Sequence, residues 1–216
     1  MSVVSPELRT RIRGIATPIA LAMGKVGLTP NALTLIGFGI AIVAAVAAAT
    51  QNWLIAGLLV VFGGVFDLFD GALARATGKA SKLGAFMDSV FDRWGEGIIY
   101  VGIAFGCVSQ FGVGAALATA ALASAFMVSY ARAKSEGLGF TEGTGMAAVG
   151  LAPREVRIVI LTVGLILAGA LGGVYFTSTG ALALSAALGL ITLLGTITVI
   201  QRIVHVLRQP PPEENQ

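Results

Sequence analysis

The sequence predicts an all-α integral membrane protein with six transmembrane helices and an N-terminal interfacial amphipathic helix. Hydrophobic residues make up 56% of the 216 residues and charged residues only 12%, whereas a soluble domain is about one quarter charged. Apolar stretches of about 20 residues, long enough to cross a bilayer, recur along the chain. The basic residues cluster around every second connection between these stretches. Together these observations indicate a bundle of membrane-spanning helices.

Residues 5–23 differ from the stretches that follow. Three arginines, Arg9, Arg11 and Arg13, precede an apolar run, and this pattern is typical of an amphipathic helix lying in the membrane interface. A cleaved signal peptide is the alternative, but no small-residue cleavage site precedes Gly27. We therefore expect an interfacial helix.

The six predicted spans form a helix bundle over residues 31–204. Their bounds are residues 31–50, 53–75, 84–108, 112–133, 156–173 and 180–204. Small residues such as Gly102 and Gly106 permit close helix packing, either within one chain or in a homodimer, and the sequence leaves both open. One membrane domain, residues 1–208, is expected, followed by a proline-rich tail, residues 209–216, that is expected to be disordered.

The distribution of charge predicts the orientation. All fourteen Lys and Arg residues lie within residues 9–25, 75–93, 132–157 and 202–208. The connections on the other side carry none, and cytoplasmic loops hold the excess of Lys and Arg. We therefore expect a multi-pass protein of the cell membrane with both termini and its polar end in the cytoplasm. The basic residues belong to helix ends and form no extended patch, so nucleic acid is not an expected partner.

Four aspartates stand close together between residues 67 and 92. One predicted helix carries, at positions i, i+3, i+4, i+7 and i+8, the residues Asp67, Asp70, Gly71, Ala74 and Arg75. The next predicted helix carries Gly84, Asp88 and Asp92 at positions i, i+4 and i+8. A carboxylate at membrane depth needs a partner or a function. Two antiparallel helices would place all four carboxylates around one point, where Mg²⁺ and substrate phosphates could bind; structural ion pairs are the alternative.

This pattern, D-x-x-D-G-x-x-A-R-x(8)-G-x-x-x-D-x-x-x-D, is similar to the signature of the CDP-alcohol phosphotransferase family, and every fixed position matches. The resemblance implies that Asp67, Asp70 and Asp88 are ligands of two Mg²⁺ ions, with Mn²⁺ as the alternative metal. It further implies that Asp92 is the catalytic base and also touches a metal ion. The residues that it implies for binding CDP are Asn31, Thr34, Asp67, Asp70, Gly71, Ala74, Arg75 and Gly84. For Asn31, helix capping is an equally good explanation.

The implied reaction takes place at the membrane surface. An acceptor hydroxyl attacks the phosphorus attached to the lipid of CDP-diacylglycerol, or of a similar CDP-linked lipid, and CMP leaves. The lipid tails would lie among membrane lipids while the head group enters a cavity that faces the cytoplasm.

Five further cations stand at predicted cytoplasmic helix ends, namely Arg132, Lys134, Arg154, Arg157 and Arg202. Guanidinium groups suit phosphate, and few acids remain to pair these cations if metal occupies the aspartates. Their arrangement resembles that of actinobacterial phosphatidylinositol-phosphate synthases, which implies inositol phosphate as the acceptor. The order of Arg132 and Lys134 is reversed relative to that pattern, and residues 137–150 form a Gly-rich loop. The positive-inside rule alone is the alternative explanation.

Two other functions are weighed against this one. With glycerol 3-phosphate as the phosphorylated alcohol, the chain would be a phosphatidylglycerophosphate synthase. A cation transporter would also place acidic residues in a helix bundle, but it would spread them through the bilayer and is often built from paired halves. Here the acids gather at one predicted face and no internal repeat is evident, which favours an enzyme.

Overall fold

The structure, a computed structural model, describes residues 6–140, 146–175 and 178–210. Within these residues it is built from helices and contains no strand. The helices are α1 (Pro6–Lys25), α2 (Pro30–Ala49), α3 (Trp53–Ala76), α4 (Lys82–Val108), α5 (Gly112–Gly137), the short 3₁₀-helix η1 (Met146–Ala148), α6 (Arg154–Ala170) and α7 (Thr179–Leu207). The predicted all-α class is confirmed. Residues 211–216 of the predicted tail lie outside the described residues.

Local signals in the sequence set where three of the helices begin. Thr29, Ser81 and Ser178 are the N-caps of α2, α4 and α7, and each side-chain oxygen accepts a hydrogen bond from the backbone N–H three residues later, at 3.0–3.2 Å. Such caps satisfy backbone donors that the first helical turn leaves free. Helices α3, α5 and α6 begin without a side-chain capping bond.

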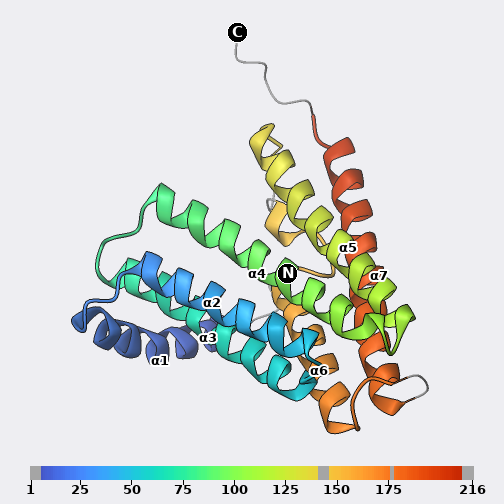
Figure 1. Ribbon diagram of the computed structural model, residues 1–216. Coiled ribbons are helices and arrows are strands. Elements are labelled where there is room, and N and C mark those ends of the chain that lie inside the picture. The colour runs from blue at the N-terminus through green and yellow to red at the C-terminus, as the bar shows by residue number, and fades with distance from the viewer. Residues whose placement is uncertain (1–5, 141–145, 176–177, 211–216) are drawn as a thin grey trace.

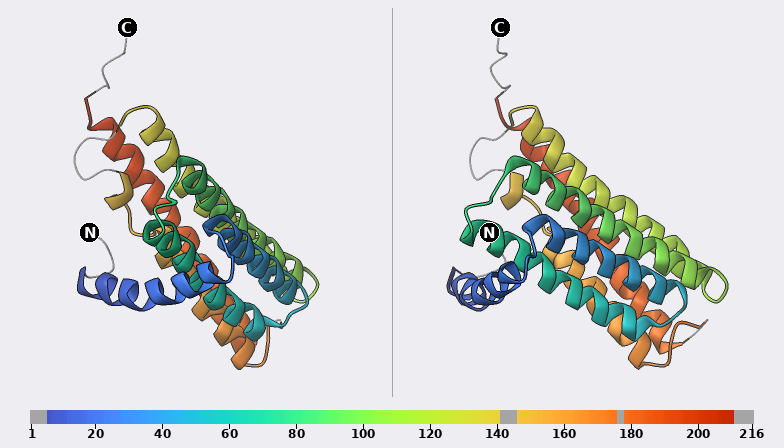
Figure 2. Two further views of the ribbon diagram at one scale, coloured as in Figure 1. Left: turned by 90° about the vertical axis from the view of Figure 1, so that its left-hand side faces the viewer. Right: turned by 60° about the vertical axis from the view of Figure 1, so that its left-hand side comes forward.

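The six α-helices from α2 to α7, here called the long helices, pack in a closed ring. Going around it, α3 contacts α2, then α4, α5, α7 and α6 follow, and α6 packs back on α3. Helix α2 therefore lies between α3 and α4, and α1 packs on α3 at an angle to the long helices (Figures 1 and 2). Trp53, Tyr100, Ile103 and Leu188 are among the fully buried side chains that fill the centre of the ring.

Small residues bring α4 against α2 within one chain. A Cβ added at Gly102 would lie 2.2 Å from the carbonyl oxygen of Ala45, and one at Gly106 would lie 2.2 Å from that of Ala48. No side chain fits at such distances, so these glycines serve the packing of a single chain. A homodimer stays a prediction.

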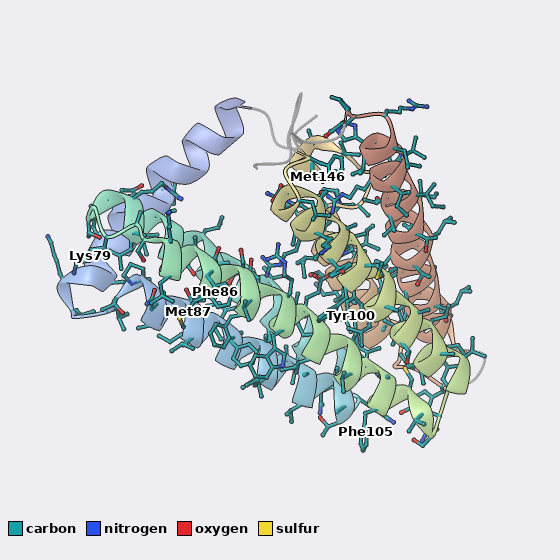
Figure 3. All side chains as sticks on the ribbon, turned by 90° about the horizontal axis from the view of Figure 1, so that it is seen from above. Lys79, Phe86, Met87, Tyr100, Phe105 and Met146 are labelled. Carbon is teal, nitrogen blue, oxygen red and sulfur yellow. The ribbon has the colours of Figure 1, made fainter. Side chains whose placement is uncertain are left out.

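Four of the long helices are long and apolar enough to cross a membrane, namely α2, α3, α5 and α7. Helix α4 carries most of its charged residues in its first half, and α6 has only 17 residues, so these two fall short of the same measure. Large apolar side chains cover the outside of the bundle, as at Phe105, which is 70% exposed (Figure 3). This apolar outer surface is that of a membrane protein.

Helix α1 follows the predicted bounds closely, spanning Pro6–Lys25 where residues 5–23 were expected. Ala16 and Ala20 are buried against Leu33 and Leu73, while Ile15 is exposed. The helix thus packs with small side chains on α3 and leaves larger apolar side chains uncovered.

Candidate active site

The first turns of α2 bring the aspartates of α3 and α4 near one another. Because α2 packs against both helices, Thr34 reaches Asp70, and its Oγ1 donates a hydrogen bond to Oδ2 of Asp70 at 2.8 Å. Asp70 is only 5% exposed. A buried carboxylate requires such a donor, since burial without one is costly. Thr34 therefore fixes the most buried of the four aspartates.

A cavity of about 200 Å³ lies between α2, α3, α4 and the turn that joins α3 to α4. We call it the signature cavity. Its lining includes Asn31, Thr34, Asp70, Gly71, Ala74, Arg75, Gly84 and Asp88. The structure thus brings together every predicted CDP-binding residue except Asp67, and it adds the predicted metal ligand Asp88.

Two glycines keep the signature cavity open. A Cβ at Gly84 would lie 3.1 Å from Oγ of Ser81 and 3.5 Å from Oδ1 of Asn31, and a Cβ at Gly71 would lie 3.1 Å from Nη1 of Arg75. Any larger side chain would narrow the space. The N-cap of α2 is Thr29, so capping does not account for Asn31.

A second, smaller cavity of about 50 Å³ adjoins the first and shares Thr34 with it. We call it the inner cavity; its polar lining comes from Asp67 on α3, Asp92 and Glu96 on α4, and Arg154 on α6. One guanidinium nitrogen of Arg154 lies 2.9 Å from Oδ2 of Asp67, and another lies 2.9 Å from Oδ2 of Asp92. Arg154 therefore links two predicted site residues from different helices.

Each of the four aspartates lies close enough to at least two of the others to interact electrostatically, and their arrangement around one point stays a prediction. Asp70 and Asp88 line the signature cavity, whereas Asp67 and Asp92 line the inner cavity. Over residues 6–140, 146–175 and 178–210, no three acidic, His or Cys side chains form a ready metal site. Helix α2 packs against both α3 and α4, and Arg154 reaches between Asp67 and Asp92.

The donor set nevertheless fits a divalent metal. Four carboxylates on two helices supply the hard oxygen ligands that Mg²⁺ and Mn²⁺ prefer, with room beside them for substrate phosphates. Three of the four are only half-buried and can change rotamer. The residues that would hold the metal are the four predicted ones, Asp67, Asp70, Asp88 and Asp92.

Only one of the five predicted acceptor cations, Arg154, lies at the aspartates. Arg157 is 1% exposed and pairs with Glu96. Arg202 is 4% exposed and donates to the backbone carbonyls of Val128 and Val149. The other two cations lie on the last turns of α5, where Lys134 is exposed and Arg132 pairs with Glu136 at 2.9 Å.

Few acids outside the aspartates were expected to pair these cations. In the part of the chain that the structure describes, two such pairs are present, Arg132 with Glu136 and Arg157 with Glu96. For Arg157 and Arg202, contact with a phosphate would require them to leave partners that bury them almost completely.

The sequence analysis missed Glu96. This residue is 4% exposed, and its two carboxylate oxygens accept hydrogen bonds from Arg157, each at 2.8 Å. The available signal was its spacing, because Glu96 follows Asp92 by four residues and Asp88 by eight. It continues the polar face of α4 towards the middle of the bundle.

Comparison with known proteins gives one family throughout. A family model described as CDP-alcohol phosphatidyltransferase matches residues 27–207. The archaetidylinositol phosphate synthase of Pyrococcus horikoshii is 35% identical over 94% of this chain and 96% of that protein. The phosphatidylinositol phosphate synthase of Cutibacterium acnes is 36% identical over 90% of this chain and 93% of that protein.

Solved structures agree with these relatives in fold. The Mycobacterium tuberculosis phosphatidylinositol phosphate synthase in complex with manganese and citrate matches with a TM-score of 0.79 and 25% identity, over 93% of each chain. The structure of the same enzyme with CDP-DAG bound also matches with a TM-score of 0.79, over 94% of this chain and 98% of that one.

Proposed function

Because this chain belongs to the CDP-alcohol phosphatidyltransferase family, we propose that it transfers the phosphatidyl group of a CDP-linked lipid to inositol phosphate and releases CMP. The observation that carries the proposal is the signature cavity, which gathers Asn31, Asp70, Gly71, Arg75 and Asp88 at one end of the bundle. More than half of its lining residues are polar or charged, and its carboxylates suit a metal-bound diphosphate.

The names of the relatives support the choice of acceptor. One relative is named for archaetidylinositol phosphate and another for phosphatidylinositol phosphate. These products share inositol phosphate and differ in the lipid part. We therefore assign inositol phosphate as the acceptor and take the donor as CDP-diacylglycerol or an analogue with another lipid. Glycerol 3-phosphate is the second candidate acceptor, since the same cations would suit its phosphate.

In this proposal each of the two cavities binds one of the two substrates. The signature cavity takes the CDP part, with Arg75 on phosphate. Asp70 and Asp88 from this cavity, with Asp67 from the adjoining inner cavity, are the metal ligands. Bound Mg²⁺ or Mn²⁺, two ions in the family pattern, would polarise the phosphorus and stabilise the charge on the leaving phosphate. The inner cavity adjoins this site, so an acceptor there would approach the lipid-bearing phosphorus.

Residues of this chain bind the acceptor and accept its proton. The acceptor oxygen forms a bond to the lipid-bearing phosphorus, and the bond from that phosphorus to the oxygen of CMP breaks. The acceptor's proton passes to a carboxylate oxygen of Asp92, and CMP leaves with the electron pair. Arg154, which contacts both Asp67 and Asp92, is the best placed cation for the acceptor phosphate. Arg132 and Lys134 are exposed and can help to attract it.

We further propose that α4 and α6 cross the membrane with the other four long helices, and that α1 lies in the interface. The ring packing of all six helices supports this, as does the absence of charged residues in the connections opposite the site. Lys79 lies in the turn at the site end (Figure 3), and Gln51 lies in the turn at the other end. A single cysteine at Gln51, in a Cys107→Ser background, should react with an impermeant maleimide in intact cells, whereas one at Lys79 should react only after lysis.

One assay tests the function. CMP release from CDP-diacylglycerol is measured with inositol phosphate, glycerol 3-phosphate, inositol or serine offered separately. Inositol phosphate should give the highest kcat/KM. Equal use of unphosphorylated inositol would contradict a phosphate-binding role for the cations, and preference for glycerol 3-phosphate would make the chain a phosphatidylglycerophosphate synthase. If no acceptor led to CMP release, a cation transporter would become the alternative function, although the gathering of acids at one end of the bundle disfavours it.

A further inference from the structure

A buried ion pair lies at the wall of the inner cavity, between Glu96 on α4, which lines the cavity, and Arg157 on α6. Nε and Nη2 of Arg157 each donate to a different carboxylate oxygen of Glu96, at 2.8 Å, so the pair is bidentate. Both side chains are almost completely buried. Burying two charges is a poor way to gain stability, and the best-attested use of such a pair is to fix one arrangement of the elements that carry it.

This pair repeats the contact that Arg154 makes at the site. Asp92 and Glu96 are four residues apart on α4, and Arg154 and Arg157 are three residues apart on α6, so two ion pairs connect the same faces of the two helices. The outer pair, Asp92 with Arg154, is partly exposed, and the inner pair is not. The inner pair is therefore the better shielded of the two, and it links α4 to α6, which otherwise packs on α3 and α7.

The same arginine also holds the segment that leads into α6. Nη1 of Arg157 donates to the carbonyl oxygen of Ala152 at 2.9 Å. On the other side of this segment, Oγ1 of Thr198 on α7 accepts hydrogen bonds from the backbone N–H groups of Leu151 and Ala152, each at 3.0 Å. Arg202 fixes the carbonyl of Val149 from α7. The preceding 3₁₀-helix packs beside α5 and contains Met146 (Figure 3).

Helix α6, like α3 and α5, begins without a side-chain capping bond. Its first turn contacts α3 and α4 through Arg154 and Arg157, and Thr198 of α7 holds the segment before it. We propose that Glu96 is a positioning residue that acts through Arg157 to set the place of Arg154 between Asp67 and Asp92. This inference rests on the proposed function, in which Arg154 meets the acceptor.

The test is a double-mutant cycle of Glu96→Gln and Arg154→Gln, with CMP release measured over a range of acceptor and CDP-lipid concentrations. Glu96→Gln keeps the size of the side chain and removes its charge. Misplacing a catalytic group by about 1 Å can cost about 10²-fold, so kcat/KM for the acceptor should fall by about ten- to a hundredfold. The KM for the CDP-lipid should stay within about twofold of wild type, since Glu96 does not line the signature cavity.

The coupling between the two substitutions decides whether Glu96 acts through Arg154. If Glu96 acts through Arg154, the double variant should be no worse than Arg154→Gln alone, within about twofold. Effects that multiply, or an unchanged kcat/KM in Glu96→Gln, would overturn the proposal. Glu155→Gln is the matched control, because this exposed carboxylate on the same first turn of α6 makes no ion pair among the described residues. It should behave as wild type.

A second route covers the case in which Glu96→Gln does not fold, as judged by thermal unfolding. Thr198→Val loosens the same segment from α7, and Thr196→Val is its control, since Thr196 is exposed and its hydroxyl bonds only within α7. The first variant should lower kcat/KM for the acceptor and couple to Arg154→Gln in the same way, and independence would overturn the proposal. If glycerol 3-phosphate proves to be the acceptor, the proposed acceptor fails but the cycle is run with that substrate and still decides the role of Glu96.

Discussion

The signature cavity and the inner cavity share a wall at Thr34 but are built in different ways. The signature cavity is formed by the ends of α2, α3 and α4, and residues close in sequence form most of its lining. The inner cavity depends on Arg154 and on its partners Asp92 and Asp67, which lie 62 and 87 residues away along the chain. The first is open and contains no ion pair among its described lining residues, whereas in the second a cation already pairs two carboxylates.

This difference suggests separate tasks. A cavity with unpaired carboxylates and small side chains can take metal ions and a diphosphate, whereas a site with a cation held against two carboxylates can recognise an anionic acceptor and accept a proton beside it. Variants of the signature cavity should then change the affinity for the CDP-lipid. Variants of the inner cavity should change kcat and the KM of the acceptor.

The largest effect is expected from removing the metal or its ligands in the signature cavity. Excess chelator should abolish CMP release, and added Mg²⁺ or Mn²⁺ should restore it, because a bound divalent ion supplies most of the charge stabilisation at phosphorus. Asp88→Asn should abolish turnover even with excess metal, with Glu155→Gln as the control. Full turnover in chelator, or a wild-type rate in Asp88→Asn, would remove the metal from the proposal.

The next largest effect is expected at Asp92 in the inner cavity. A general base contributes roughly 10²- to 10⁴-fold to the rate, so Asp92→Asn should lower kcat by that factor. Its affinity for the CDP-lipid, measured by equilibrium binding in the presence of metal, should remain near that of wild type. If affinity falls as far as it does in Asp67→Asn, then Asp92 is primarily a metal ligand and the two cavities do not divide the work as proposed.

The contrast between the cavities also explains what the sequence could predict. The signature places eight residues at fixed spacing on two consecutive helices, and helical periodicity alone puts Asp70, Gly71 and Arg75 on one face. The family assignment made from it is confirmed by the match over residues 27–207. The bounds of α2, α3 and α5 were also close, since Thr29 caps the first of these helices and each carries a long apolar run.

The inner cavity could not be predicted in the same way. Nothing local indicates that Arg157 meets Glu96 across 61 residues, or that α2 lies between α3 and α4. Without that packing, five cations at helix ends looked equivalent, and only Arg154 reaches the aspartates. The predicted roles of Arg132, Lys134, Arg157 and Arg202 remain predictions, and burial makes the last two the least accessible to a ligand.

Comparing Arg154 with Arg132 sharpens the assignment of the acceptor site. Losing one charge-assisted contact costs about 1.5–3 kcal/mol, so Arg154→Gln should raise the acceptor KM roughly ten- to a hundredfold. Arg132 makes an exposed pair with Glu136, and such pairs contribute about 0–1 kcal/mol, so Arg132→Gln should raise it only a few-fold. Steady-state kinetics on both variants decide between them, and equal effects would extend the acceptor site to the end of α5.

A moderate effect, on the CDP-lipid alone, is expected at Thr34, where the two cavities meet. Thr34→Val keeps the shape of the side chain but removes the hydroxyl that donates to Asp70 at 2.8 Å, so this buried carboxylate loses a partner at a cost of about 1–2 kcal/mol. If Asp70 serves the CDP-lipid, the KM for that substrate should rise by about five- to thirtyfold while the acceptor KM stays nearly unchanged. Thr119→Val is the matched control, because its exposed hydroxyl bonds only to the carbonyl of Ala115 within α5. A change confined to the acceptor KM would show that Asp70 serves the acceptor and not the CDP-lipid. The proposed assignment of one substrate to each cavity would then be wrong.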